Sequence, residues 1–140
     1  MKIGIIIQAR TDSDRFPKKV LELIDDKSVL WHVINQCKQT KLEIIVATTK
    51  RKIDDPIVEI AKKSKVRFFR GSKNDVLDRY YQVAKKFGLE WIIRITADCP
   101  IVDPRESIKV AKLLRSSNID YVALDEKTYP DGLDTEGFTF

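Results

Sequence analysis

The sequence predicts an α/β domain built on a Rossmann-like, mostly parallel sheet. Short runs of β-branched residues alternate with longer segments whose apolar residues recur at helical spacing. Residues 3–7 are almost wholly apolar, which is typical of a strand buried on both faces of a parallel sheet. Because the strands are separated by helices, right-handed crossovers are expected, and residues 1–140 are predicted to form one domain.

The first half of the chain predicts three strands joined by two helices. Each helix begins at a side chain that can cap it, and its apolar residues face one side. The third strand is the least apolar and is expected to be the least buried. In order, the segments are a strand at 3–7, a helix after Ser28, a strand at 43–49, a helix after Asp54 or Asp55 with Pro56 in its first turn, and a strand at 65–70.

The second half repeats the pattern until residue 124. A helix opened by Asn74 or Asp75 ends at Gly88, a residue favoured just past helix ends. The remaining segments are a strand at 91–95, a helix from about 103 to 116, a strand at about 120–124, a turn at 127–132 and a strand-like stretch at 133–140. Since the last stretch ends on an apolar residue, we expect the chain to be the N-terminal portion of a longer domain.

Composition predicts a single hydrophobic core and a cytoplasmic protein. The chain is 43% hydrophobic and 34% charged. No apolar run approaches the ~20 residues of a membrane span, and residues 1–20 lack a secretory signal pattern, so no membrane partner is expected. Cys37 and Cys99 lie far apart and near no second cysteine or histidine, which argues against a disulfide framework or a zinc site.

The formal charge of +5 does not predict nucleic-acid binding. Lysines and arginines are scattered among 21 acidic residues, with only short clusters at 50–52 and 62–65. Nucleic-acid binding proteins usually carry a continuous basic stripe instead. Most of these charges are therefore interpreted as solvated faces.

A cation-rich segment follows the first strand. Residues 8–19 carry Arg10, Arg15, Lys18 and Lys19, with Ser13 among them. In open α/β sheets ligands bind beyond the carboxyl ends of the strands, and guanidinium and ammonium groups suit phosphate oxygens. This first loop, residues 8–19, predicts a triphosphate site; the alternative is a solvated loop whose charges serve solubility.

Asp98 directly follows the fourth predicted strand, so its carboxylate would stand at the same sheet edge as the first loop. Mg²⁺ bound to nucleotide phosphates commonly takes one or two protein carboxylates. The residue is therefore a candidate metal ligand, and its alternative is a turn or helix cap before Pro100.

Four segments in the same order resemble the spore-coat-polysaccharide-type cytidylyltransferases, relatives of the CMP-Kdo and CMP-sialic acid synthetases. They are Ile7–Arg10 with Ser13, Arg15, Pro17 and Lys19, then Asp75–Tyr81, Arg94–Pro100 and Tyr129–Asp134. The resemblance implies the nucleotide-diphospho-sugar transferase fold. It also implies activation of a sugar as its CMP derivative, from CTP and with pyrophosphate release, in surface polysaccharide biosynthesis.

The resemblance assigns roles to seven residues and implies Mg²⁺ as cofactor, with CTP and a sugar as partners. The catalytic set is Arg15, Lys19 and Asp98, with Asp98 binding the metal; Arg10 and Ser13 hold phosphates, and Asp78 and Arg79 lie near the nucleoside. A surface ion pair is the alternative for the last two. Arg94 either supports Asp98 or forms a structural pair, and a homodimer is left open.

The first loop differs from the family pattern at Asp12 and Lys18, where glycine is usual. Glycine would allow left-handed backbone and close approach to phosphate, and Asp12 and Asp14 add negative charge to a loop meant for an anion. The resemblance also places a second metal-binding acid and much of the sugar-binding region beyond residue 140. The alternative function is thus a non-catalytic nucleotide or sugar-nucleotide binding module.

Overall fold

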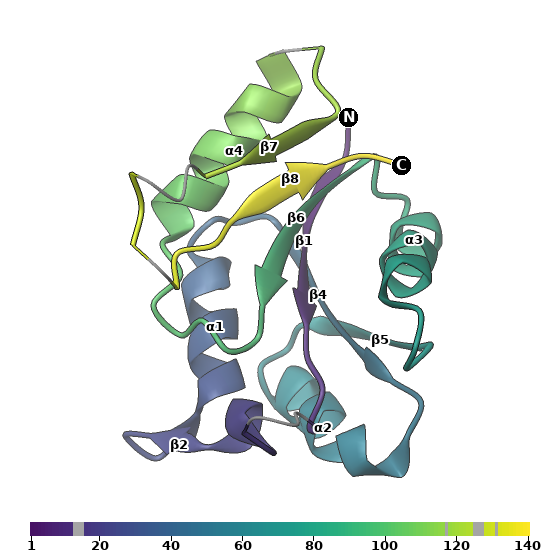
Figure 1. Ribbon diagram of the computed structural model, residues 1–140, viewed down its shortest axis with the longest axis vertical. Coiled ribbons are helices and arrows are strands. Elements are labelled where there is room, and N and C mark those ends of the chain that lie inside the picture. The colour runs from purple at the N-terminus through teal and green to yellow at the C-terminus, as the bar shows by residue number, and fades with distance from the viewer. Residues whose placement is uncertain (13–15, 117, 125–127, 131) are drawn as a thin grey trace.

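A computed structural model describes residues 1–12, 16–116, 118–124, 128–130 and 132–140. Within them, six strands form one mixed sheet (Figure 1). Its order is β5 (Arg67–Gly71), β4 (Glu43–Thr49), β1 (Ile3–Gln8), β6 (Trp91–Thr96), β8 (Glu136–Phe138) and β7 (Tyr121–Ala123). The first four run parallel to one another, whereas β8 is antiparallel to both β6 and β7. The predicted α/β fold with a mostly parallel sheet is confirmed.

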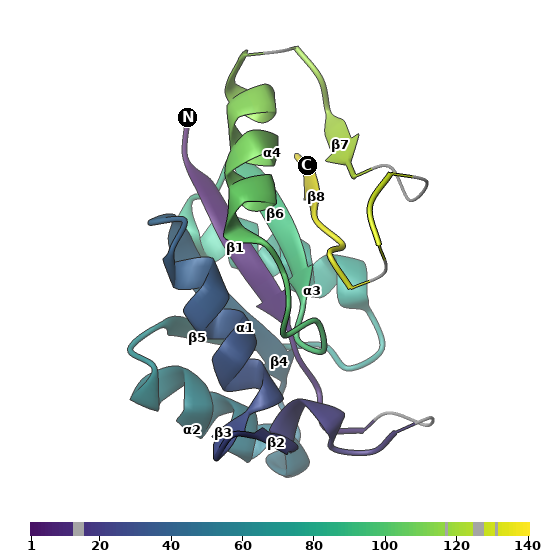
Figure 2. The same cartoon turned by 90° about the vertical axis from the view of Figure 1, so that its left-hand side faces the viewer.

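Helices cover both faces of this sheet (Figures 1 and 2). Those packed on one face are α1 (Val29–Lys38), α2 (Asp55–Lys63) and α4 (Pro104–Ser116), while α3 (Val76–Phe87) packs on the other. Side chains alternate along β1, so Ile5 and Ile7 join the core under α1 while Ile6 joins the core under α3. The prediction of a first strand buried on both faces is therefore confirmed.

Local signals account for the start of α1 and for both ends of α3. The Ser28 hydroxyl accepts a hydrogen bond from the Trp31 amide at 3.1 Å, and Gly88 adopts φ 64° after α3. Asp75, one of the two expected starts of α3, accepts from the Asp78 amide at 2.8 Å. Asp54 precedes α2 without capping it, because its buried carboxylate bonds other residues.

Two parts of the fold differ from the expectation. Short 3-10 turns, η1 (Lys19–Leu21) and η2 (Lys52–Asp54), and a hairpin of β2 (Leu23–Ile24) and β3 (Lys27–Ser28) were not predicted. Leu23 and Ile24 are exposed by 67% and 43%, so the apolar run there is not core. The expected strands at 120–124 and 133–140 are shorter, and the predicted turn at 127–132 falls partly outside the described residues.

The core contains Cys37, as expected from its place on α1. Burial raises the pKa of the Cys37 thiol to about 12. No helix in the described part of the chain is long and apolar enough to cross a membrane. Both ends of the described chain lie at the end of the molecule away from the first loop (Figure 1).

Candidate functional site

The carboxyl ends of β1 and β6 meet at one edge of the sheet. Gln8 and Thr96 are paired in register, and the Ala97 amide donates to the Gln8 carbonyl at 3.1 Å. From β1 the chain goes on to β4 on one side, and from β6 it goes on to β7 on the other side. Ligands bind in open α/β sheets at such a point, where the strand order reverses. A cleft of about 340 Å³ opens there, lined by Gln8, Arg10, Lys19, Val20, Arg94, Thr96, Ala97 and Asp98.

Lys19 and Asp98 face each other across this cleft. The Lys19 ammonium donates a short hydrogen bond to the Asp98 carboxylate, and both side chains are about one-third exposed. Burial raises the pKa of Asp98, but the hydrogen bond and charge of Lys19 outweigh it and hold that pKa below the ordinary value. The cleft therefore presents an ionised carboxylate that already has a cation beside it.

Asp98 suits a magnesium ion that arrives with a nucleotide. Among the described residues, no three or more His, Cys, Asp or Glu side chains are grouped so that they could hold a metal ion. A single carboxylate is nevertheless the usual protein contribution where phosphate oxygens and water supply the other ligands of Mg²⁺. The donor set thus fits a phosphate-bound metal better than a metal held by protein alone.

Two arginines line the same cleft with different surroundings. Arg10 is exposed and, within the described residues, has no hydrogen-bond or ion-pair partner. Arg94 donates to Glu136 on β8 at 3.0 Å, so it forms the structural pair that was one of its two expected roles. Arg10 is consequently the cation that an incoming anion meets without breaking an existing bond.

Arg79 is almost fully buried on α3, with 1% of its surface exposed. None of its three guanidinium nitrogens has a hydrogen-bond partner in the part of the chain that the structure describes. The alternative of a surface ion pair with Asp78 is therefore wrong. Asp78 is half-buried, accepts a hydrogen bond from Gln82 at 3.0 Å and does not line the cleft.

The surroundings of Arg79 place it beside the strand ends. A Cβ added at Gly71, the last residue of β5, would lie 3.0 Å from the Arg79 Cγ, so glycine leaves room for this side chain. Burial lowers the pKa of the Arg79 guanidinium, and the charges of Arg10 and Arg51 lower it further. A desolvated cation thus stands beside the end of β5, outside the lining of the cleft and with no anion bonded to it among the described residues.

The first loop is described only at its two ends, because Ser13, Asp14 and Arg15 lie outside the described residues. The Lys18 amide donates to the Thr11 carbonyl at 2.7 Å, which closes the neck of the loop. Lys18 adopts φ 59°, a left-handed conformation that glycine would adopt without steric cost.

Sequence reasoning missed the residues that fasten this loop. Asp54 accepts from the Thr11 amide at 2.8 Å, from the Thr11 hydroxyl at 2.7 Å and from the Thr49 hydroxyl. Arg51 donates to both oxygens of Asp12. Arg51 belongs to the basic cluster at 50–52, whose charges the sequence predicts to be solvated. Its position two residues after the second buried strand is the signal of a role at the strand ends.

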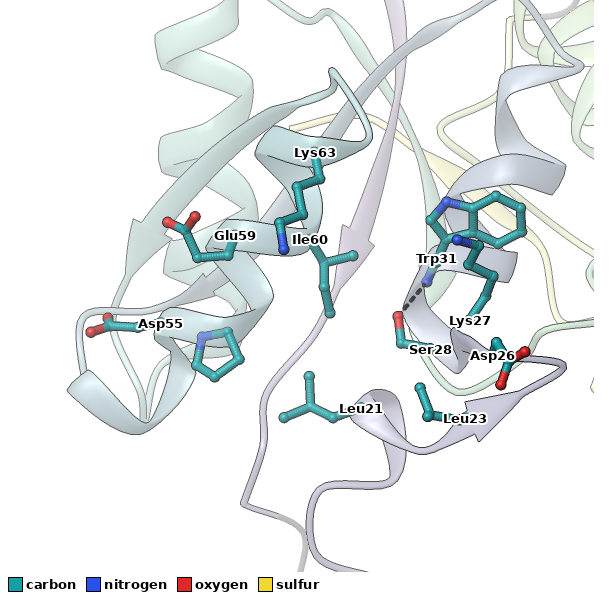
Figure 3. A pocket seen from close by; sticks show the side chains of 11 residues that line it. Leu21, Leu23, Asp26, Lys27, Ser28, Trp31, Asp55, Glu59, Ile60 and Lys63 are labelled. Atoms are coloured by element: carbon teal, nitrogen blue, oxygen red, sulfur yellow. Dashed lines mark hydrogen bonds between the residues drawn. The ribbon is translucent and has the colours of Figure 1, made fainter.

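A wider cavity of about 880 Å³ lies elsewhere, between α1, α2 and the β2–β3 hairpin (Figure 3). Trp31, Leu21 and Ile60 supply much of its apolar wall, and Lys63 points toward it. None of the residues predicted to hold phosphate, metal or nucleoside lines this cavity. The smaller cleft, where the polar groups from two strand ends converge, is the better candidate site.

The family model described as cytidylyltransferase matches residues 4–136. A protein of unassigned function from Methanocaldococcus jannaschii is 42% identical over all of this chain and 58% of its own length. The spore coat polysaccharide biosynthesis protein SpsF of Bacillus subtilis is 35% identical over 73% of this chain and 45% of its own. A 3-deoxy-manno-octulosonate cytidylyltransferase of Rickettsia bellii is 30% identical over 94% of this chain and 55% of its own length.

Solved structures agree with this fold. A cytidylyltransferase from Leptospira borgpetersenii superposes with a TM-score of 0.94 and 38% identity over 99% of this chain and 60% of that one. A CMP:2-keto-3-deoxy-manno-octonic acid synthetase solved with CTP superposes with a TM-score of 0.77. The match covers 99% of this chain and 74% of that one at 17% identity, which shows a common fold. The chain spans about half the length of the curated relatives it matches.

Proposed function

This chain belongs to the cytidylyltransferase family, and we propose that its strand-end cleft binds CTP with Mg²⁺ for cytidylyl transfer to a sugar. In that reaction a sugar hydroxyl oxygen bonds to the α-phosphorus of CTP while the bond between that phosphorus and the bridging oxygen to the β-phosphorus breaks. The hydroxyl proton is released and pyrophosphate leaves. Such transfers depend on positioning and on neutralising charge around phosphorus.

The observation that carries this proposal is the charge of the cleft: among the described residues that line it, Arg10, Lys19 and Arg94 are cations and Asp98 is the single carboxylate. Arg10 has no hydrogen-bond or ion-pair partner among the described residues, so an anion can bind it without breaking an existing bond. This balance of charge suits a triphosphate.

Five residues of the cleft and the first loop, and two residues of α3, have tasks in this scheme. Arg10 and Lys19 bind phosphate oxygens, and Ser13 and Arg15 of the first loop join them there. Lys19 exchanges its bond to Asp98 for one to phosphate, which releases the carboxylate to hold the metal. Mg²⁺ bound there would offset charge on the phosphate oxygens. Asp78 and Arg79 hold the nucleoside side of the ligand.

A second candidate is a nucleotide or sugar-nucleotide binding module without turnover. It is favoured by the first loop, in which Asp12 and Lys18 depart from the glycines of the family pattern. The family relation to spore coat polysaccharide biosynthesis and 3-deoxy-manno-octulosonate cytidylyltransferases makes an acidic or surface-polysaccharide sugar the proposed acceptor for the transferase.

The two candidates differ in their need for Asp98. We would measure the CTP dissociation constant with and without Mg²⁺ in the wild type and in Asp98→Asn, with Asp103→Asn as control because Asp103 lies outside the cleft. The transferase predicts Mg²⁺-dependent binding that only Asp98→Asn makes Mg²⁺-independent. Binding that ignores Mg²⁺ in the wild type would favour the module, and absence of CTP binding would contradict both.

Pyrophosphate release from CTP with a panel of sugars measures turnover itself. We expect release near background from residues 1–140, because a sugar oxygen that is not held in line forfeits several kcal/mol of the benefit of positioning. Robust, Mg²⁺-dependent release that Asp98→Asn abolishes would show instead that these residues suffice for transfer.

A further inference from the structure

Asp12 and Arg51 form a two-pronged ion pair beside the cleft. The two terminal nitrogens of Arg51, Nη1 and Nη2, each donate to one carboxylate oxygen of Asp12 at 2.5 Å. The Lys73 ammonium adds a longer contact of 3.7 Å to the same carboxylate. The negative charge that Asp12 brings into the first loop is therefore matched by a guanidinium from outside the loop.

Arg51 is itself held on the connection between β4 and α2. Its amide and Nε donate to the Thr49 hydroxyl at 3.3 and 3.2 Å, and its Nη2 lies 3.4 Å from the Asp54 carboxylate. Its carbonyl accepts from the Arg70 guanidinium at 2.6 Å. A side chain fixed at this many points acts as a rigid anchor rather than as a flexible surface cation.

The same connection also reaches the backbone of the first loop. Asp54 binds both the amide and the hydroxyl of Thr11, and the Thr11 carbonyl accepts from the Lys18 amide. Thr11 directly follows Arg10, and Lys18 directly precedes Lys19. Fastening Thr11, Asp12 and Lys18 therefore fixes the backbone from which Arg10 and Lys19 extend.

We propose that Arg51 is a positioning residue for nucleotide phosphates, which acts through Asp12 by clamping the start of the first loop and cancelling its negative charge. The inference rests on the proposed function. It gives a role to the aspartate by which the first loop departs from the family pattern: Asp12 serves as the attachment point for Arg51. The residue touches no phosphate itself.

The test compares CTP with CMP, which shares the nucleoside and lacks the β- and γ-phosphates. Calorimetry would be run on Arg51→Met, Asp12→Asn and the charge-exchanged double variant Asp12→Arg with Arg51→Asp. Arg67→Met is the matched control, because Arg67 pairs with Glu43 at the opposite end of the strands. We expect Arg51→Met and Asp12→Asn each to weaken CTP binding at least tenfold and CMP binding less than threefold, with partial recovery in the double variant.

Several results would overturn the clamp. They are wild-type CTP affinity in both single variants, tighter binding by Asp12→Asn, or an equal loss for CTP and CMP, which would indicate general structural damage.

Hydrogen exchange at the Thr11 and Lys18 amides gives a readout that needs no ligand. We expect exchange at least tenfold faster in Arg51→Met than in Arg67→Met, and unchanged exchange would contradict the proposal. Absence of nucleotide binding by the wild type would refute the proposed function alone.

Discussion

Arg79 is a residue whose burial is unfavourable unless a partner accepts its hydrogen bonds. Its guanidinium makes no hydrogen bond within the described residues, whereas that of Arg70 donates to Thr49, Asp55 and Arg51. Burying a charge without partners costs several kcal/mol, and hydrogen-bond acceptors of a bound nucleoside would reduce this cost. Function and stability therefore place opposite demands on this side chain.

Replacing Arg79 by Met should raise stability and remove binding. The free energy of unfolding without ligand should increase by about 1 to 3 kcal/mol, because an apolar chain of similar length replaces an unpaired charge. CTP affinity should fall below detection. Urea unfolding and calorimetry measure the two effects. Arg70→Met is the matched control and should instead destabilise by about 1 to 3 kcal/mol, since its hydrogen bonds are satisfied. A destabilised Arg79→Met would contradict this account.

Lys18 holds a backbone conformation that suits glycine. A left-handed non-glycine residue costs roughly 1 to 2 kcal/mol, while glycine adds about 0.4 to 1 kcal/mol of unfolded-state entropy. Lys18→Gly should therefore stabilise the fold by about 0.5 to 1 kcal/mol in thermal or urea unfolding. Lys112→Gly, at an exposed position inside α4, should destabilise by about 1 kcal/mol. Loss of stability in Lys18→Gly would mean that its side chain makes a contact worth more than the strain.

At the scale of elements, local signals were predictive and long-range pairing was not. Ser28, Asp75 and Gly88 act on neighbouring backbone, so the ends of α1 and α3 could be predicted from adjacent residues. The antiparallel placement of β8 against β6 depends on residues more than forty positions apart, which no local pattern encodes. The β2–β3 hairpin was not predicted, because its residues Leu23 and Ile24 are apolar and yet exposed.

Asp54 joins two elements and gives a pH-dependent contribution to stability. Burial raises the pKa of its carboxyl, but the hydrogen bonds from Thr49 and Thr11 together have the larger, opposite effect. The pKa of Asp54 is therefore below its ordinary value. A carboxyl with a lowered pKa stabilises the fold above its unfolded value of about 3.9 and loses that contribution as the pH falls through the folded value.

Asp54→Asn should therefore destabilise the protein by about 1 to 3 kcal/mol at pH 7, because the buried Thr11 and Thr49 donors lose an ionised acceptor. The difference from the wild type should shrink as the pH drops below about 4. Urea unfolding at several pH values measures it, and Asp120→Asn controls for the loss of one exposed charge. If the difference in unfolding free energy stays constant down to pH 2, ionisation of Asp54 does not contribute to stability.

At the scale of the whole molecule, strand order explains why the site could be predicted in part. Gln8 and Thr96 end neighbouring parallel strands, so the sequence alone indicated that Arg10, Lys19 and Asp98 would converge, and they line one cleft. The burial of Arg79 and the ion pair between Arg51 and Asp12 depend on packing among α3, β4, β5 and the first loop. Neither is encoded by spacing along the chain.

Calorimetric titration of the wild-type chain with nucleotides in the presence of Mg²⁺ tests the central claim most directly. We expect CTP to bind with a dissociation constant between about 1 μM and 1 mM, and at least tenfold more tightly than ATP or GTP, which corresponds to about 1.4 kcal/mol. The absence of heat with any of the three, at protein concentrations near ~1 mM, would contradict a nucleotide site at the strand ends. Equal affinity for all three would contradict its selectivity for CTP.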